Sequence, residues 1–290
     1  MAKANTKPSA VSNILEFDTE AIKAREAEVA QETDEQIMDR LRERFEILDS
    51  MTRAVKEGNV RAMIVSGPPG VGKSFGVETV LEKADLFNKL AEKKPKYEVV
   101  KGACSAIGLY AKLYEFSAHG NVVVFDDCDS ILMEDLSLNI LKGALDSSSR
   151  RFISWNTDSR ILRSEGIPDR FEFKGAAIFI TNIKFHNIKS KRLKDHLEAL
   201  ESRCHYIDLE MDTAREKILR IKQIATDGML DKYDFENPLI VRDELVNFIT
   251  ENQSKLRELS LRTVLKLADL RKAFPANWQA MARNTIMRRA

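Results

Sequence analysis

The sequence predicts an α/β protein with a three-layer parallel sheet, followed by a small all-helical domain. Strand-length apolar runs alternate with segments of helical periodicity as far as about residue 211. The runs at 61–65, 121–126 and 175–182 have apolar cores of consecutive residues rather than an alternating pattern, which is typical of parallel strands covered on both faces. Strand signals then disappear, and only helical periodicity remains.

Each predicted element has its own signal. The apolar runs predict strands at 61–65, 96–101, 121–126, 175–182 and 205–209. Apolar residues at helical spacing predict helices at 75–81, 107–116, 136–145, 191–201, 214–229, 242–253 and 261–273. Ahead of the first strand, Thr33-Asp34-Glu35-Gln36 has the form of a capping box, and the helix that it opens is expected to end near Gly58.

These elements imply three parts. Residues 1–32 are polar and predict a flexible N-terminal arm. Residues 33–211 form the α/β domain, with an insertion at about 146–174, and residues 212–290 form a helical lid with a basic C-terminal tail.

Composition narrows the class of protein. The 290 residues are 43% hydrophobic and 31% charged, with a net charge of +1, so the chain as a whole has no field that attracts nucleic acid or membrane. No signal peptide is visible at the N-terminus, and no apolar run is long enough to cross a bilayer. Three scattered cysteines suit a reducing compartment. We therefore expect a cytoplasmic protein without a membrane partner.

Residues 67–74 match the phosphate-binding loop pattern G-x-x-x-x-G-K-[ST] at every required position. The stretch follows a predicted strand and opens a predicted helix, and this context indicates a nucleotide site. Glycines let successive backbone N–H groups turn inward around phosphate oxygens. We expect Lys73 to reach the β- and γ-phosphates of ATP, and the Ser74 hydroxyl to bind Mg²⁺. The residues expected to bind nucleotide are Gly67, Pro68, Pro69, Gly70, Val71, Gly72, Lys73 and Ser74.

A second part of this site follows the apolar strand at 121–126, which has the form of a Walker B strand. A parallel strand that ends in a carboxylate delivers it to the sheet edge where the phosphate loop lies. We expect Asp126 to hold Mg²⁺ and Asp127 to polarise the attacking water. Asp129 is expected to cap the N-terminus of a helix.

The order of these elements resembles the AAA+ family of ATPases over about residues 34–275. The resemblance implies that Asn182, which ends a predicted strand, is the sensor that orients the lytic water. Ser202-Arg203-Cys204 looks like the S-R-C motif of clamp-loader subunits, which implies that Arg203 is an arginine finger acting on the neighbouring subunit's ATP. Arg262, in the first turn of a lid helix, looks like the second sensor. Each assignment has an alternative. Asn182 is then an ordinary turn residue, Arg203 caps the C-terminus of a helix, and Arg262 is a solvated residue on a helix face.

The resemblance also implies a homo-oligomeric ring or spiral that hydrolyses ATP at subunit interfaces. A motor or switch in DNA replication, recombination or helicase loading is the leading interpretation, and the small module has the look of phage proteins. A protein-remodelling ATPase similar to MoxR is an alternative. The family pattern ends in Asp-Glu where this chain has Asp127, so a nucleotide-dependent scaffold with weak turnover is a third interpretation.

The insertion at 146–174 contains two strand-like pieces, at 151–155 and 170–173. It resembles the hairpin inserted before the first sensor in some AAA+ branches, including helicases and MoxR-like proteins. Its basic character suits contact with DNA or with an acidic protein. The arginines expected to make this contact are Arg150, Arg151, Arg160 and Arg163. The alternative is a two-stranded extension of the main sheet with solvated arginines.

Overall fold

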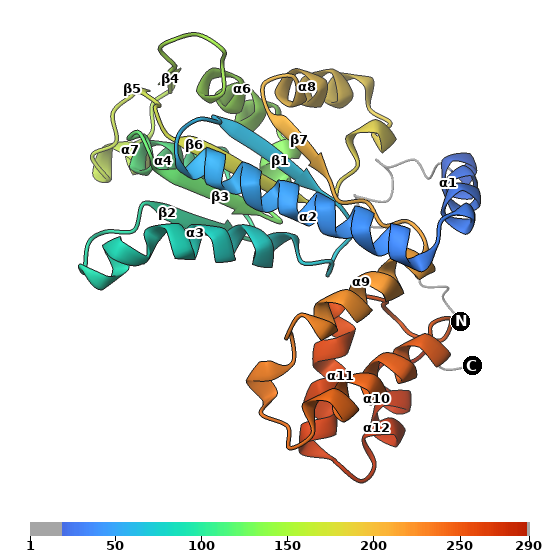
Figure 1. Ribbon diagram of the computed structural model, residues 1–290. Helices are drawn as coiled ribbons and strands as arrows, with labels where there is room; N and C mark the ends of the chain where they lie inside the picture. Colours follow the sequence, from blue (N-terminus) through green and yellow to red (C-terminus); the bar gives the residue numbers. More distant parts are fainter. Residues whose placement is uncertain (1–18, 289–290) are drawn as a thin grey trace, which may run out of the picture. The chain divides into compact units, whose positions relative to one another are not determined.

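The structure is a computed structural model that describes residues 19–288 (Figure 1). The chain divides into two compact units. The α/β unit comprises Ile47–Gly67 and Ser74–Asp208, and the helical unit comprises Glu20–Glu46, Pro68–Lys73 and the chain from Leu209 onward. Residues 1–18 of the predicted arm lie outside the described residues, and the rest of the arm includes helix α1 (Thr19–Gln31).

Five strands form one parallel sheet in the order β2-β3-β6-β1-β7. They are β1 (Ala62–Ser66), β2 (Tyr97–Lys101), β3 (Val122–Asp126), β6 (Ala176–Thr181) and β7 (His205–Asp208). Every residue of the three central strands is buried, as continuous apolar runs require. At the carboxyl end of β1, Ser66 pairs with Thr181 on one side and Asp208 on the other.

Helices cover both faces of this sheet. Their bounds are α2 (Asp34–Lys56), α3 (Lys73–Leu90), α4 (Ala106–Glu115), α5 (Asp129–Met133), α6 (Asp135–Ala144) and α8 (Lys191–Glu201), and a 3₁₀ turn, η2, covers Phe185–Asn187. Ile64 and Phe179 share a buried cluster with Leu109, Leu141 and Leu197, which belong to α4, α6 and α8. Alternate strand residues such as Met63 point to the other face, where α2 and α3 lie (Figure 1). The predicted three-layer parallel fold is confirmed.

The insertion forms a small sheet of its own. Strands β4 (Phe152–Ser154) and β5 (Arg170–Glu172) pair in antiparallel fashion, apart from the main sheet. The connection between them contains helix α7 (Arg160–Ser164), which the sequence did not predict. The hairpin is therefore confirmed, and an extension of the main sheet is wrong.

The helical unit has a separate core. Its later helices are α9 (Ala214–Thr226), α10 (Pro238–Glu251), α11 (Leu261–Ala273) and α12 (Trp278–Thr285), and a 3₁₀ turn, η3, covers Asp231–Tyr233. Helix α12 lies where we expected a basic tail. Trp278, Ala282 and Ile286 recur every four residues, and all three are buried in the core that α10 and α11 help to form. Within residues 19–288, no helix combines the length and the apolar character of a membrane span.

Two capping boxes open helices of this unit. The predicted box is confirmed, because the Thr33 N–H donates to Gln36 Oε1 at 2.8 Å and the Gln36 N–H donates to Thr33 Oγ1 at 3.2 Å. The second box was not predicted and joins Thr213 to Glu216 at the start of α9. The buried Glu216 carboxylate also accepts hydrogen bonds from Arg25 and Arg40, at 3.1 and 3.2 Å. Side-chain bonds therefore tie α1 and the first turns of α2 to α9.

Candidate nucleotide-binding site

Ser74 and Asp126 meet at the carboxyl edge of the sheet. The Ser74 Oγ, in the first turn of α3, donates a hydrogen bond to Asp126 Oδ1 at 2.8 Å. Burial raises the pKa of the Asp126 carboxyl, the bond from Ser74 opposes this shift, and the charge of Asp127 adds to it. Lys101, at the end of β2, places its Nζ 3.8 Å from Asp126 Oδ2. Lys101 was not predicted as a site residue, although its place at a strand end next to β3 could have indicated it.

Asp127 and Asn182 form the next pair along this edge. The Asn182 Nδ2 donates to Asp127 Oδ1 at 2.9 Å, and the Asp127 N–H donates to the carbonyl of Ile180 at 3.0 Å. Asp127 has a φ of 52°, in the left-handed region where Asp and Asn are favoured over most other residues. Asp therefore suits the backbone better here than the longer Glu of the AAA+ pattern.

Asp129 does not cap a helix. Cys128 occupies the N-cap position of α5, without a side-chain capping bond, and Asp129 is the first residue inside the helix. Its Oδ1 accepts a hydrogen bond from the Thr181 Oγ1 at 2.7 Å. The expected N-cap role is wrong, and Asp129 instead joins α5 to the end of β6.

The phosphate loop from Pro68 to Lys73 belongs to the helical unit. Gly70 and Gly72 have φ values of 71° and 106°, which side chains with a Cβ rarely adopt. The Lys73 side chain is buried, and its Nζ donates to the carbonyl of Pro68 at 2.9 Å. The lysine therefore folds back over its own loop.

The first turn of α11 contacts this loop. The Leu261 N–H donates to the carbonyl of Gly70 at 2.9 Å. A Cβ added to Gly70 would lie 2.7 Å from the Ser260 Cβ and 3.3 Å from Glu258 Oε1. The exposed Arg262 is the next residue in this turn. Glu258 and Ser260 were not predicted as neighbours of the loop, because no motif marks a residue that reaches the loop only through the fold.

The side chains suit ATP and Mg²⁺. Mg²⁺ takes oxygen ligands and is usually held by one or two protein groups together with phosphates and waters. The Ser74 hydroxyl and the Asp126 carboxylate, 2.8 Å apart, supply oxygens of this kind. The loop has the glycine conformations that a phosphate cradle requires.

Arg203 lies at the opposite edge of the sheet. It precedes β7 by two residues, and β7 pairs with β1 from His205 opposite Met63 to Asp208 opposite Ser66. The phosphate loop leaves β1 at the other end of this pairing. At about 3.3 Å per strand residue, the three residue steps between the two ends of this pairing span roughly 10 Å, and Arg203 lies beyond the amino end. Arg203 does not join the cluster of Ser74 and its carboxylate partners.

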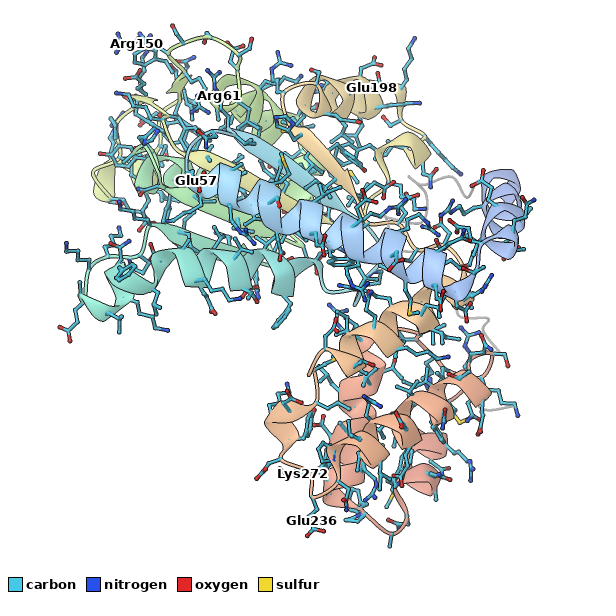
Figure 2. All side chains as sticks on the ribbon, in the orientation of Figure 1. Glu57, Arg61, Arg150, Glu198, Glu236 and Lys272 are labelled. Atoms are coloured by element: carbon cyan, nitrogen blue, oxygen red, sulfur yellow. The ribbon has the colours of Figure 1, made fainter. Side chains whose placement is uncertain are left out.

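The surroundings of Arg203 resemble a helix cap. Its Nη1 donates to the carbonyl of Ala199 in the last turn of α8, and its buried Nε has no partner among the described residues. The pKa of the Asp146 carboxyl is lowered chiefly by the backbone N–H of Ser148, and further by the charges of Arg203 and Arg61. Arg203 and Arg61 therefore share the amino edge of the sheet, and Figure 2 labels Arg61 there.

The insertion is less cationic than its sequence indicates. Arg151 is buried, donates to the carbonyls of Ala144 and Gly175 at 3.0 Å each, and has its pKa lowered to about 10 by burial. The prediction that Arg151 contacts a partner is therefore wrong. Arg150, labelled in Figure 2, is exposed but pairs with Glu172 at 3.0 Å.

The other two predicted contact residues lie on the connection between β4 and β5. Arg163 pairs with Asp158 at 2.6 Å. Arg160 is exposed at the first position of α7. Of the four arginines expected to contact a partner, three are therefore exposed, and two of these already have carboxylate partners.

The fold and the loop define a P-loop α/β protein with a helical domain after the sheet. The sequence is 33% identical over 258 residues to the uncharacterized 36.7 kDa protein in the nrdC–mobD intergenic region of Enterobacteria phage T4. The match covers 88% of this chain and 77% of the T4 protein. The chain belongs to the same family as that phage protein. Comparison with models of known protein families finds no match.

Solved structures give distant similarities. The replication initiator DnaA bound to AMPPCP and single-stranded DNA has a TM-score of 0.47 at 12% identity, and covers 82% of this chain and 63% of its own. AMPPCP-bound DnaA from Aquifex aeolicus has a TM-score of 0.44 at 13% identity, with the same coverage of 82% and 63%. NtrX from Brucella abortus in complex with ATP has a TM-score of 0.46 at 12% identity, and covers 87% and 53%. The chain thus spans less than two thirds of each of these proteins.

Proposed function

We propose that this protein is an AAA+-type ATPase that binds ATP with Mg²⁺ and hydrolyses it where two copies of the chain meet. The observation that carries the proposal is the cluster at the carboxyl edge of the sheet. There Ser74 is bonded to Asp126, and Asp127 to Asn182, directly after a complete phosphate-binding loop. A glycine-rich turn without a ligand would not require these four side chains at one edge.

Each residue has a distinct task. The loop N–H groups and Lys73 bind the phosphates, and Ser74 and Asp126 hold the ion. When bound, Mg²⁺ would neutralise charge on the phosphate oxygens. Asp127 accepts a proton from the attacking water, and Asn182 keeps the Asp127 carboxylate oriented through the 2.9 Å bond.

We propose that a neighbouring copy of the chain supplies the cation that stabilises the transferred phosphoryl group. Hydrolysis develops negative charge on the transferred phosphoryl group, and a permanently charged guanidinium stabilises it. Arg203 sits at the far edge of its own sheet, so it would act on the site of the next copy in a head-to-tail assembly. Arg262, beside the loop in its own chain, would couple the helical unit to the bound nucleotide.

For the biological role, we propose a motor or switch in DNA replication, recombination or helicase loading, acting in the cytoplasm. The S-R-C motif around Arg203 supports it. The pairing of Arg150 and Arg163 with carboxylates leaves little free charge for DNA on the insertion. That observation favours protein remodelling as a second candidate.

Turnover measured on the full chain separates these roles. We expect ATP hydrolysis that depends on Mg²⁺ and rises several-fold with single- or double-stranded DNA. Stimulation by an unfolded protein, but not by DNA, would support the remodelling role instead. Tight ATP binding without turnover under any condition would leave a scaffold, and a chain that fails to bind ATP at all would refute the whole proposal.

A further inference from the structure

Four polar side chains join α3 to the ends of β2 and β3 in the α/β unit. The register of the two strands pairs Lys101 with Asp126, so both residues lie at the carboxyl edge of the sheet. Glu78 follows Ser74 by four residues on α3, so these two side chains share one face of the helix. Ser74 bonds to Asp126 at 2.8 Å, and the Lys101 Nζ donates to Glu78 Oε1 at 2.6 Å. The helix and the strand ends are therefore connected twice.

The Lys101 ammonium group lies between two carboxylates. Its Nζ is 2.6 Å from Glu78 Oε1 and 3.8 Å from Asp126 Oδ2, which is beyond hydrogen-bond distance. The pKa of Lys101 is raised, chiefly by the bond with Glu78 and further by the charges of Asp126 and Asp127, although burial opposes the shift. The Lys101 side chain is 58% exposed, and its flexible four-carbon stem can turn toward either neighbour.

This position matters for a metal ion at the same edge. A divalent cation held by Ser74 and Asp126 is repelled by an ammonium group beside the same carboxylate. When Lys101 bonds to Glu78 instead, the Glu78 carboxylate offsets the ammonium charge and keeps it away from Asp126. An exposed ion pair of this kind contributes little to folding stability. Its place beside a proposed Mg²⁺ ligand is therefore the property that calls for an explanation.

We propose that Lys101 competes with Mg²⁺ for the Asp126 carboxylate, and that Glu78 limits this competition by holding the Lys101 ammonium group. Lys101 and Glu78 are then positioning residues that tune the affinity of the site for Mg²⁺ without touching the nucleotide. The inference rests on the proposed function, because it requires that Ser74 and Asp126 hold the ion.

The test measures how much Mg²⁺ strengthens the binding of a fluorescent, non-hydrolysable ATP analogue to the full chain. The affinity is measured with Mg²⁺ and with EDTA, and the ratio of the two values is the gain due to the ion. Lys101→Met should increase this gain by about 3- to 10-fold, because the competing cation is lost. Glu78→Gln should reduce the gain by a similar factor, because the released ammonium group turns to Asp126. In EDTA, both variants should bind the analogue about as tightly as the original protein does.

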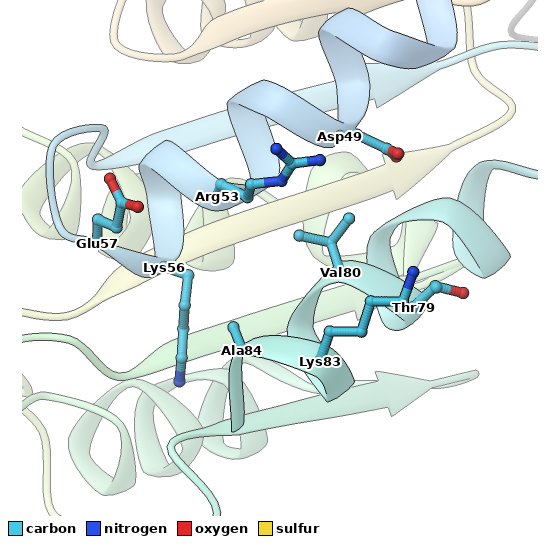
Figure 3. Close-up of a pocket in the computed structure, with 8 residues that line it drawn as sticks. All are labelled: Asp49, Arg53, Lys56, Glu57, Thr79, Val80, Lys83 and Ala84. Atoms are coloured by element: carbon cyan, nitrogen blue, oxygen red, sulfur yellow. The ribbon is translucent and has the colours of Figure 1, made fainter. Parts of the chain in front are cut away.

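Matched controls lie on α3 itself. Lys83→Met removes an ammonium group from the side of the helix that faces α2, where Lys83 lines a groove with Thr79 and Val80 (Figure 3). Glu82→Gln removes an exposed carboxylate one turn after Glu78. Neither control should change the gain by more than about two-fold.

The double variant distinguishes this competition from two charges that act independently. In the Lys101→Met background, Glu78→Gln should change the gain by less than about two-fold, because no ammonium group is left to release. An equal effect of Glu78→Gln in both backgrounds would overturn the proposal. So would a Lys101→Met variant that does not increase the gain, or that binds the analogue more weakly in EDTA, as the loss of a phosphate contact would cause.

Failure of the proposed function gives a different result. An original protein that binds no analogue, or binds it equally well with and without Mg²⁺, would refute the proposed site for ATP and Mg²⁺, and this inference with it. A clear gain from Mg²⁺ in the original protein that none of the variants alters would refute only the role of Lys101 and Glu78.

Discussion

The two edges of the central sheet differ in how their charges are satisfied. At the carboxyl edge, Ser74 bonds to Asp126 and Asn182 bonds to Asp127. At the amino edge, Arg203 bonds only to a carbonyl of its own helix and makes no ion pair with any described carboxylate. One edge thus presents carboxylates beside a phosphate loop, and the other presents a cation that, among the described residues, has no carboxylate at ion-pair distance and lowers the pKa of the Asp146 carboxyl from farther away.

This difference supports the proposal that two copies of the chain contribute different residues to one ATPase site. Parallel strands fix the two edges at opposite ends, so no side-chain rotation brings Arg203 to Asp126 or Asp127 of its own chain. A head-to-tail assembly places the amino edge of one copy against the carboxyl edge of the next. ATP binding should then depend only on residues at the carboxyl edge, whereas ATP turnover should depend on residues at both the carboxyl edge and the amino edge.

Arg203→Ala should produce the largest effect on turnover. The loss of a cation from the transferred phosphoryl group is expected to slow hydrolysis by about 10³-fold, as for arginine fingers in GTPases. ATP affinity should stay nearly constant, because Lys73, Ser74 and Asp126 remain. Paired measurements of turnover and of ATP binding check this, with Arg192→Ala on α8 as the control. If both quantities fell together, Arg203 would have a structural role.

Asp127→Asn should have the next largest effect on ATP turnover, and it changes only a residue of the carboxyl edge. An amide cannot accept the proton of the attacking water, so turnover should fall by roughly 10²-fold or more while ATP still binds. Asn also tolerates the left-handed backbone at this position, so folding should be preserved. Single-turnover kinetics provide the measurement. Unchanged turnover would transfer the role of base to another carboxylate, and Asp129 is the next candidate.

Lys73→Ala should weaken ATP binding itself. The loss of a charge-assisted bond to phosphate costs about 3 kcal/mol, or roughly 100-fold in Kd. Lys89→Ala, on the same helix but exposed, is the control. Equilibrium binding of a fluorescent ATP analogue measures both variants. An affinity within a few-fold of the original protein would mean that the loop does not hold the phosphates.

Glu258→Gln should have the smallest effect, in the opposite direction. Its Oε1 lies close to Gly70 of the phosphate loop, and Lys266 pairs with its Oε2 at 3.7 Å, so we expect it to repel the phosphates of bound ATP only weakly. Removing the charge should tighten binding by roughly 2- to 5-fold, which corresponds to about 0.5–1 kcal/mol across partly screened distances. Glu251→Gln on α10 should leave the affinity unchanged. Weaker binding by Glu258→Gln would show that this carboxylate supports the loop rather than opposing the ligand.

The sequence predicted the main sheet closely. Its strands lie within about a residue of the predicted runs, because a strand buried on both faces must be apolar at nearly every position. The capping box at Thr33 was predicted for a similarly local reason. Helix α12 was not predicted, because Arg283, Arg288 and Arg289 indicated a basic tail, although Trp278, Ala282 and Ile286 recur every four residues. Local sequence patterns were sufficient to predict the bounds of an element where all of its residues are buried to a similar extent.

The candidate site was predictable only in part. The loop and the two carboxylates of β3 are adjacent in sequence, so a motif marks them. The prediction for Arg151 was wrong because the sequence shows only its charge. It does not show that the folded chain brings the carbonyl of Gly175, 24 residues away, to bond the buried guanidinium. Periodicity likewise shows that α3 has apolar positions, but not that Phe87 is left uncovered. Such features depend on tertiary contacts that a short sequence window does not contain.

Mixing two inactive variants tests the shared site most directly. Arg203→Ala chains keep Asp127, and Asp127→Asn chains keep Arg203, so an interface that joins the first to the second is complete. In randomly mixed assemblies at equal amounts, about a quarter of the head-to-tail interfaces should be complete, and turnover should return to about that fraction of the original activity. Demonstrably mixed assemblies that remain inactive would contradict the account. So would a chain that stays monomeric with ATP and still hydrolyses it at full rate.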